Sequence, residues 1–297
     1  MQRARARISQ ASTLVATACG LIEYREAGAG VPLLAVHGSG GGFDQGMAFA
    51  GVLAQQGIRV IAMSRFGYLR TPMPAAVAAA SAAAQADAHV CLLDALGIRR
   101  AAVMGGSAGA PSALQMAIRH PDRVSALVLL VPLAYKPPTQ AESAPPMPAW
   151  VEKLMMRMIG SDFLFWAALH VARDQVIQLV LATPPGLLKS ATAPERARVD
   201  AMLDNILPVS ARAAGLKSDT AVGKHLAPSP LASIRVPTLI ISARDDGYGT
   251  YASAQYTANQ IAGATFIGFE EGGHTWVGHN DEVMAAIAKL VAPPGLR

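Results

Sequence analysis

Residues 101–110, AAVMGGSAGA, decide the fold of this chain. The apolar start of the run predicts a short buried strand, and the apolar pattern of ALQMAIRH behind it predicts a helix. Between strand and helix stand Gly105, Ser107 and Gly109 in the order G-x-S-x-G. Side chains at the glycine positions would clash with the adjoining strand and helix, so the pattern indicates a tight, strained turn. Such a turn lifts the Ser107 hydroxyl to the carboxyl edge of a sheet, at the N-terminus of a helix.

Further apolar runs surround this turn and extend the sheet. Four of the runs are continuous rather than alternating, which is typical of parallel strands covered on both faces; they are VPLLAVHG, IRVIAM, AAVMGG and SALVLLVP. Helical patterns separate them, so the chain is predicted to be an α/β protein with a mostly parallel, doubly wound sheet. The runs are LIEYREAG (21–28), VPLLAVHG (31–38), IRVIAM (58–63), SALVLLVP (125–132), VPTLIISA (236–243) and ATFIGFE (264–270).

A helical insertion is expected to interrupt the sheet between residues 133 and 232. It opens with five prolines between positions 137 and 148 and continues with helical patterns. Residues 1–132 and 233–297 are then the core domain, and 133–232 form a helical cap over Ser107. The cap is rich in aromatic and methionine residues, which favours an apolar, adaptable substrate. These residues are Trp150, Phe163, Phe165, Trp166, Met147, Met155, Met156 and Met158.

A serine hydroxyl needs a base to act as a nucleophile. His274 follows the last apolar run in Gly272-Gly273-His274-Thr275-Trp276, where glycines allow a loop to bring the imidazole over the sheet edge, and His279 is the alternative. The base in turn needs an acceptor that fixes its tautomer. Asp245 and Asp246 directly follow the strand LIIS. The chain order Ser, Asp, His matches one of the known orders of such triads.

Together these segments resemble the α/β-hydrolase fold, over roughly residues 20–132 and 233–293. The resemblance rests on LLAVHGSGGG, RVIAMSRFGYLRT, LLDALGI, MGGSAGA, RHPDRVSALVLL, VPTLIISARDD and GGHTW. It implies that Ser107 is the nucleophile, His274 the base and Asp246 the acid, with Asp245 as the alternative acid. Ala243 replaces a family glycine, and Gly247-Tyr248-Gly249 replaces a region that often holds a proline.

The loop HGSGGG resembles the oxyanion-hole loop of that family. The resemblance implies that the backbone N–H of Ser39, or of Gly40, acts with the N–H of Ala108 on a tetrahedral oxyanion. His37 usually has a structural part in this loop. Arg65, in SRFGYLRT, is interpreted as organising the loop rather than binding substrate.

The resemblance implies a serine hydrolase that cleaves an ester-like acyl bond of a small, largely apolar substrate through an acyl-enzyme. We also expect Gly40, Trp166 and Trp276 to contact this substrate. A carbon–carbon hydrolase or a perhydrolase-type enzyme on the same triad, or a non-catalytic ligand-binding protein of this fold, are the alternatives. A serine nucleophile excludes the dehalogenases and epoxide hydrolases, which attack with a carboxylate. No spacing indicates a cofactor or a metal site.

Composition sets limits on other functions. Hydrophobic residues make up 52% and charged residues 15% of the 297 positions, which excludes a disordered chain. The formal charge of +5 includes Arg3, Arg5 and Arg7, and no basic run with aromatics points to nucleic acid. No apolar run reaches the ~20 residues that span a bilayer.

Cys91 is interpreted as a small core residue. A cytoplasmic, reduced location is expected, with export through a weak lipoprotein-like site at Cys19 as the alternative. The oligomeric state is not indicated.

Overall fold

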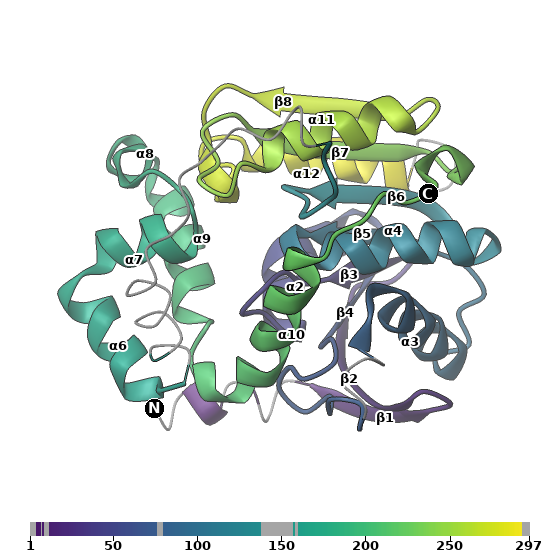
Figure 1. Cartoon of the computed structure of the whole chain (residues 1–297), viewed down its shortest axis with the longest axis horizontal. Helices are drawn as coiled ribbons and strands as arrows, with labels where there is room; N and C mark the ends of the chain where they lie inside the picture. Colours follow the sequence, from purple (N-terminus) through teal and green to yellow (C-terminus); the bar gives the residue numbers. More distant parts are fainter. Residues whose placement is uncertain are drawn as a thin grey trace.

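A single eight-stranded sheet forms the centre of the computed structural model, which describes residues 4–6, 8, 12–75, 80–137, 157 and 160–292. The strand order is β1-β2-β4-β3-β5-β6-β7-β8 (Figure 1). β1 pairs antiparallel with β2, and β2 antiparallel with β4; every later pair is parallel. The strands are β1 (Thr13–Thr17), β2 (Gly20–Ala27), β3 (Val31–Val36), β4 (Ile58–Met63), β5 (Ala101–Gly106), β6 (Val124–Leu130), β7 (Thr238–Ala243) and β8 (Thr265–Phe269).

The predicted continuous apolar strands are confirmed, because the central strands are covered on both sides. Alternate residues of a strand point to opposite faces. In β3, Leu34 and Val36 pack with α3 (Ala82–Ala95), α4 (Ala110–Arg119) and α11 (Thr250–Gln260) on one face. Leu33 and Ala35 pack with α2 (Phe43–Ala50) and α12 (Asn280–Val291) on the other. The expected α/β class with a doubly wound, mostly parallel sheet is therefore correct.

The insertion between β6 and β7 is helical, as expected, and lies beside the sheet in Figure 1. Its helices have a core of their own around Phe165, Val199 and Leu203. Domain boundaries at 133 and 232 stay a prediction, and Met147, Trp150, Met155, Met156 and Met158 lie outside the described residues. The cap helices are α6 (Asp162–Val171), α7 (Arg173–Val180), α8 (Pro185–Ser190), α9 (Ala193–Asp204) and α10 (Ala213–Lys224).

Short 3₁₀ helices connect several of these elements. Two of them carry candidate site residues, because η3 begins at Ser107 and η8 contains His274. They are η1 (Gly51–Gln56), η3 (Ser107–Gly109), η4 (Pro121–Arg123), η6 (Val209–Arg212), η7 (Leu231–Ser233) and η8 (Gly273–Thr275). Within the described ranges, no helix has the length and apolar character needed to cross a bilayer.

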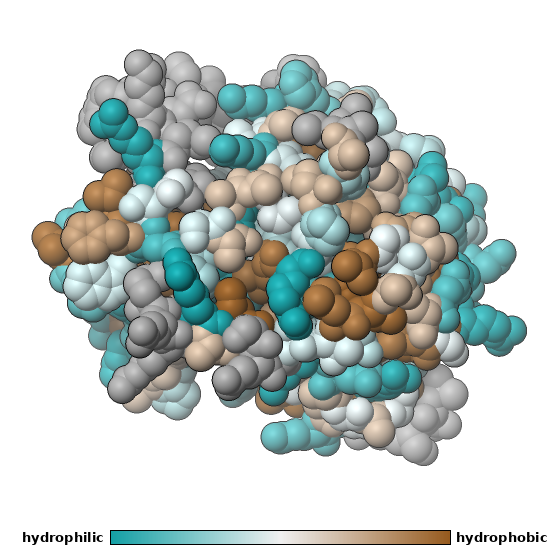
Figure 2. All heavy atoms as spheres, turned by 90° about the horizontal axis from the view of Figure 1, so that it is seen from below, coloured by the Kyte–Doolittle hydropathy of each residue, from teal (hydrophilic) through white to brown (hydrophobic). Residues whose placement is uncertain are grey.

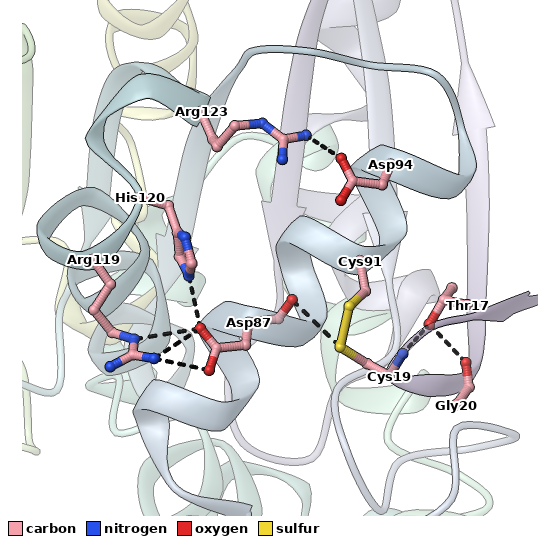
Figure 3. Close-up of a disulfide and its surroundings, with 9 residues drawn as sticks. All are labelled: Thr17, Cys19, Gly20, Asp87, Cys91, Asp94, Arg119, His120 and Arg123. Carbon is pink, nitrogen blue, oxygen red and sulfur yellow. Dashed lines mark hydrogen bonds and ion pairs between the residues drawn. A yellow bond between two sulfur atoms is a disulfide. The ribbon is translucent and has the colours of Figure 1, made fainter.

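The two cysteines differ from expectation, since Cys91 is not simply a small core residue. Cys19, in the turn between β1 and β2, forms a disulfide with Cys91 on α3, with 6.0 Å between their Cα atoms (Figure 3). The same view shows Asp87 of α3 accepting hydrogen bonds from Arg119 and contacting His120. The periodicity around Cys91 describes only its own helix and could not indicate a partner 72 residues away. The disulfide ties the β1–β2 hairpin to α3.

Reduction of this disulfide should lower thermal stability by several degrees. Closing a loop of 72 residues restricts the unfolded chain, which is worth about 4 kcal/mol on the chain-entropy model. Thermal unfolding with and without a reducing agent measures the effect. The Cys19→Ser/Cys91→Ser double variant is the control, because it should match the reduced protein and not respond to reductant. An equal melting temperature for oxidised and reduced wild-type protein would contradict the prediction.

Candidate active site

Ser107 lies in a strained turn between β5 and α4. Its φ is 48°, in the left-handed region that residues other than glycine rarely adopt. The glycines around it are required by close contacts. A Cβ added to Gly105 would lie 2.7 Å from the Cβ of Ala113, and one added to Gly109 would lie 2.5 Å from the carbonyl oxygen of His37. The predicted turn is therefore present, and it leaves Ser107 half-buried at the carboxyl end of β5.

Candidate backbone donors are found in two segments next to Ser107. Ala108 is in the first turn of the helical segment that begins at Ser107, where N–H groups have no acceptor within the helix. The 37–42 loop lies directly against the serine, since a Cβ on Gly38 would be 3.0 Å from the Ser107 Cβ. Gly40 N–H donates to the Tyr68 hydroxyl at 3.3 Å, whereas Ser39 N–H has no acceptor among the described residues. Of the two loop donors expected, Ser39 is thus the one still open to an oxyanion.

His274 and Asp246 are brought together by the loops that follow β8 and β7. Nδ1 of His274 is 2.8 Å from Oδ2 of Asp246. The carboxylate also accepts hydrogen bonds from the Tyr248 N–H at 2.9 Å and from the Thr250 hydroxyl. Burial alone would raise the pKa of Asp246, but the charge and hydrogen bond of His274, with these two donors, lower it below its ordinary value. Asp246 is therefore ionised at neutral pH and faces the imidazole.

Asp245 has a different set of partners. Its carboxylate accepts the N–H groups of Gly272, at 3.2 Å, and Gly273, at 2.8 Å. It therefore fixes the backbone just before His274 and does not contact the imidazole. Adjacent carboxylates thus hold the same histidine loop, one through its main chain and the other through its side chain.

Ser107 and His274 lie at the same edge of the sheet, because the carboxyl ends of parallel β5, β7 and β8 meet there. In the described structure the Ser107 hydroxyl is not hydrogen-bonded to His274. Catalytic hydrogen bonds are often long before substrate binds, so the arrangement permits a serine–histidine pair that closes with substrate.

His37 is buried, and its ring contacts backbone groups of Arg65 and Gly38. Its Nε2 accepts the Arg65 N–H at 2.9 Å, and its Nδ1 lies 2.7 Å from the Gly38 carbonyl oxygen. Burial, and then the charge of Arg65, hold the pKa of His37 well below its usual value. His37 is therefore neutral and orders its own loop, as the resemblance implied. Arg65 donates to the His37 carbonyl oxygen at 3.0 Å, in agreement with the organising role expected for it.

The three residues expected to contact substrate lie in different parts of the structure. Gly40 is buried beneath the cap, where an added Cβ would lie 3.7 Å from Ile206. Trp276 is only 2% exposed and packs edge-on against Phe49 in the core. Trp166 is 40% exposed on α6. A few brown and tan residues stand at the left end of Figure 2, where Figure 1 places α6, while the largest brown area of Figure 2 lies at and to the right of the centre. The structure therefore puts Gly40 next to the cap, Trp276 in the core against Phe49, and Trp166 on a partly exposed face of α6.

The alternative base His279 points elsewhere. Its ring stacks on Phe269 with centroids 3.8 Å apart, and its Nδ1 is 3.8 Å from a carboxylate oxygen of Glu282. The structure gives it no contact with Asp246 or Asp245. His274 is thus the histidine whose surroundings suit a base.

Comparison with known families identifies the fold. A family model described as the alpha/beta hydrolase fold matches residues 31–277. The chain belongs to this family. The α/β hydrolase is similar to an alpha/beta hydrolase fold protein from Nakamurella multipartita, at 30% identity and a TM-score of 0.75, covering 96% of this chain and 100% of that one. It also shares its fold with an esterase from Exiguobacterium antarcticum, at 19% identity and a TM-score of 0.67, covering 93% and 96%.

Curated relatives match a part of this hydrolase. A 2-hydroxymuconate semialdehyde hydrolase from Pseudomonas putida is 42% identical over 106 residues, 35% of this chain and 37% of the relative. A 2-hydroxy-6-oxo-6-phenylhexa-2,4-dienoate hydrolase from Comamonas testosteroni is 34% identical over 115 residues, 38% and 40% of the two chains. The matched segment thus spans less than half of either relative.

Sequence reasoning missed two charged cap residues of this hydrolase. Arg212 is fully buried, pairs with Asp44 at 2.7 Å and donates to the Gly41 carbonyl oxygen. Asp219, on α10, forms an ion pair with Arg65 at 2.7 Å. Nothing local marks these residues, because a charge on a helix is ordinarily solvent-exposed. Only the closeness of the cap to the 37–42 loop reveals them.

The cap of the hydrolase also contacts the loops that carry the acid and the base. Tyr248 packs edge-on against the His274 ring, with centroids 4.8 Å apart, and its hydroxyl donates to the Val180 carbonyl oxygen at 3.0 Å. The Ala182 carbonyl oxygen accepts the N–H of Gly247 at 2.9 Å and that of His274 at 3.4 Å. All three loops of the candidate site therefore depend on where the cap lies.

A cavity of about 1020 Å³ lies between α10, α4 and the segment that follows β6. Its walls are mostly apolar and include Pro111, Leu114, Leu133 and Val222. Ser107 and His274 do not line it, but Leu133 donates its N–H to the Ser107 carbonyl oxygen at 3.0 Å. An apolar space thus adjoins the turn that carries the serine. Among the described residues, no group of three or more His, Cys, Asp or Glu side chains could hold a metal ion.

Proposed function

We propose that this α/β hydrolase is a serine hydrolase that cleaves an ester-like acyl bond of a small, largely apolar substrate. One observation carries the proposal. Ser107 is held at positive φ at a helix N-terminus, while an Asp246–His274 pair 2.8 Å apart occupies the same sheet edge. A strained serine, a histidine and an ionised carboxylate at one edge are the groups that acyl transfer needs.

In the proposed reaction Ser107 Oγ attacks the carbonyl carbon of the substrate. The hydroxyl proton moves to Nε2 of His274, whose Nδ1–H remains hydrogen-bonded to Asp246. The N–H groups of Ser39 and Ala108 donate to the oxyanion, each worth ~3 kcal/mol of transition-state stabilisation. His274 then protonates the leaving oxygen and the acyl-enzyme forms. A water molecule then attacks the acyl carbon and gives a proton to His274. The bond between the acyl carbon and Ser107 Oγ breaks, His274 returns the proton to Ser107 Oγ, and the acid is released.

An apolar substrate is supported by the cavity beside the serine turn. Four of its lining residues, Pro111, Leu114, Leu133 and Val222, are apolar and come from both core and cap. Pockets with such walls and few polar groups bind ligands mainly by removing apolar surface from water.

Carbon–carbon bond hydrolysis is the second candidate. The names of the two partial relatives from Pseudomonas putida and Comamonas testosteroni favour it, at 42% and 34% identity over about a third of the chain. The same triad would serve it, since a serine acyl-enzyme can also form by loss of a carbon leaving group. Ester hydrolysis is placed first because it needs only the proposed triad and oxyanion donors.

Labelling with a fluorophosphonate, followed by a substrate panel, tests these proposals. We expect a single adduct on the peptide that contains Ser107, and turnover of short p-nitrophenyl esters. A lactone and a vinylogous diketone in the same panel separate ester hydrolysis from carbon–carbon hydrolysis. Folded protein that neither reacts with the probe nor turns over any of the panel would instead be a ligand-binding member of the fold.

The cytoplasmic location remains a proposal, and the Cys19–Cys91 disulfide favours the exported alternative. Disulfides persist mainly in oxidising compartments. Alkylation of the thiols in freshly lysed cells, read by intact mass, distinguishes the two. Two alkylated cysteines indicate a reducing compartment, and none indicates an oxidising one.

A further inference from the structure

A buried carboxylate of the cap lies against the loop that carries Ser39. Asp219, on α10, accepts a hydrogen bond from the Ser39 hydroxyl at 3.0 Å and one from the Tyr68 hydroxyl at 2.5 Å. Its two oxygens also accept hydrogen bonds from the two terminal nitrogens of Arg65, each at 2.7 Å. One cap side chain therefore binds three donors of the core.

The surroundings make these contacts strong. Asp219 is 6% exposed, Arg65 2% and Tyr68 not at all, so water competes little for the hydrogen bonds among these three residues. Ser39 itself is exposed, and its hydrogen bond to Asp219 is partly buried. Burial alone would lower the pKa of Arg65, but the Asp219 carboxylate raises it, so the guanidinium stays charged. Burial, and then Asp219, raise the pKa of Tyr68 well above its usual value, which keeps the hydroxyl protonated as a donor. A charged, bidentate Arg–Asp pair of this kind also fixes the relative orientation of the two side chains.

Each core partner of Asp219 is itself attached to the 37–40 backbone. Arg65 donates to the carbonyl oxygens of His37, at 3.0 Å, and Gly38, at 3.3 Å. The Tyr68 hydroxyl accepts the Gly40 N–H at 3.3 Å. The backbone on both sides of Ser39 is thus held by groups that Asp219 holds.

We propose that Asp219 is a positioning residue, through which the cap sets the place of the Ser39 N–H beside Ser107. The inference rests on the proposed function, because it assigns the cap a part in forming the oxyanion hole. Asp219 acts through Ser39, Arg65 and Tyr68 and touches no reacting atom. Donors to the oxyanion act on the transition state more than on bound substrate, so their displacement lowers kcat rather than raising KM.

The test compares Asp219→Asn with a matched control, Asp200→Asn. Asp200 is also a cap aspartate paired with an arginine, Arg173, at 2.6 Å, but its side chain is 48% exposed. We expect Asp219→Asn to lower kcat for a p-nitrophenyl ester about 10- to 100-fold with KM within about threefold, less than the full loss of an oxyanion donor. Asp200→Asn should leave both constants at wild-type values.

Hydrogen exchange of the peptide that covers residues 37–42 gives a readout independent of activity. It should be faster in Asp219→Asn and unchanged in Asp200→Asn. If Asp219→Asn does not fold, Tyr68→Phe takes its place, because it removes only the hydroxyl between Asp219 and Gly40 and should lower kcat in the same direction by a smaller factor.

The outcomes separate this inference from the proposed function. Unchanged kcat, or unchanged exchange of the 37–42 peptide, in a folded variant of an active enzyme would overturn the positioning role and leave the serine hydrolase standing. A rise in KM with unchanged kcat would also overturn it and would make Asp219 a residue of substrate binding. A wild-type protein without turnover or probe labelling would overturn the proposed function, and the positioning role with it.

Discussion

Replacement of Ser107 by alanine should lower kcat/KM by at least three orders of magnitude and leave the fold intact. Removal of a triad nucleophile typically costs 10³- to 10⁶-fold, because no other group can form the acyl-enzyme. Alanine fits the turn, since it adds nothing to the space that Ser107 already fills at a φ of 48°. Turnover of the best ester from the panel, with circular dichroism and thermal unfolding, measures both parts of the prediction.

The control for this variant is Ser190→Ala, which changes an exposed serine at the end of α8. It should keep wild-type turnover and probe labelling. Ser107→Ala with more than about a hundredth of the wild-type rate would contradict a nucleophilic role. The activity would then have to come from another group or from a contaminant.

The neighbouring aspartates should respond very differently to the same substitution. Asp246→Asn is expected to lower kcat by about 10⁴-fold. An amide beside Nδ1 of His274 can donate a hydrogen bond and so favours the tautomer that cannot accept the serine proton. The lowered pKa of Asp246 means that wild-type protein keeps the carboxylate form throughout the neutral range. Steady-state kinetics at pH 7–8 measures the loss.

Asp245→Asn is the matched control, one position away on the same loop. Its remaining oxygen can still accept the Gly273 N–H, now 2.8 Å from the carboxylate, while the contact with Gly272 is lost. We expect a loss of tenfold or less, with some loss of thermal stability. A larger loss for Asp245→Asn than for Asp246→Asn would reassign the acid to Asp245.

The contacts between cap and core would let the cap influence the reaction rate as well as which substrates bind. In this hydrolase the helical insertion contacts the loops of the candidate site directly. Asp219 holds the 37–40 loop, and the Ala182 carbonyl oxygen binds the N–H of His274. A cap that shifts with the size of a substrate would therefore move groups that act on the reacting carbonyl. Variants of cap residues are then expected to affect rates as well as substrate range.

Much of the fold is local and was predictable from the sequence. The class of the sheet follows from apolar runs such as β5 and β7, because burial on both faces removes the need for polar residues at alternate positions. The serine turn was predictable from the G-x-S-x-G pattern within five consecutive residues. Gly105 is required by its local contact with Ala113 of α4, whereas Gly109 is required by a contact with the end of β3, which is distant in the chain. Ser107 and His274 could be proposed from the sequence because each follows a strand in a glycine-rich loop.

Only the tertiary structure decided the pairings between distant residues. The residues alone left Asp245 and Asp246 both open and the family resemblance favoured Asp246; the 2.8 Å contact between Asp246 and His274 supports that proposal. The Cys19–Cys91 disulfide and the Asp219–Arg65 pair join residues 72 and 154 positions apart. Local patterns report whether a residue faces the core or solvent, because that depends on near neighbours along the chain. Which buried group meets which depends on how the cap and the sheet pack together, and no short stretch of sequence contains that information.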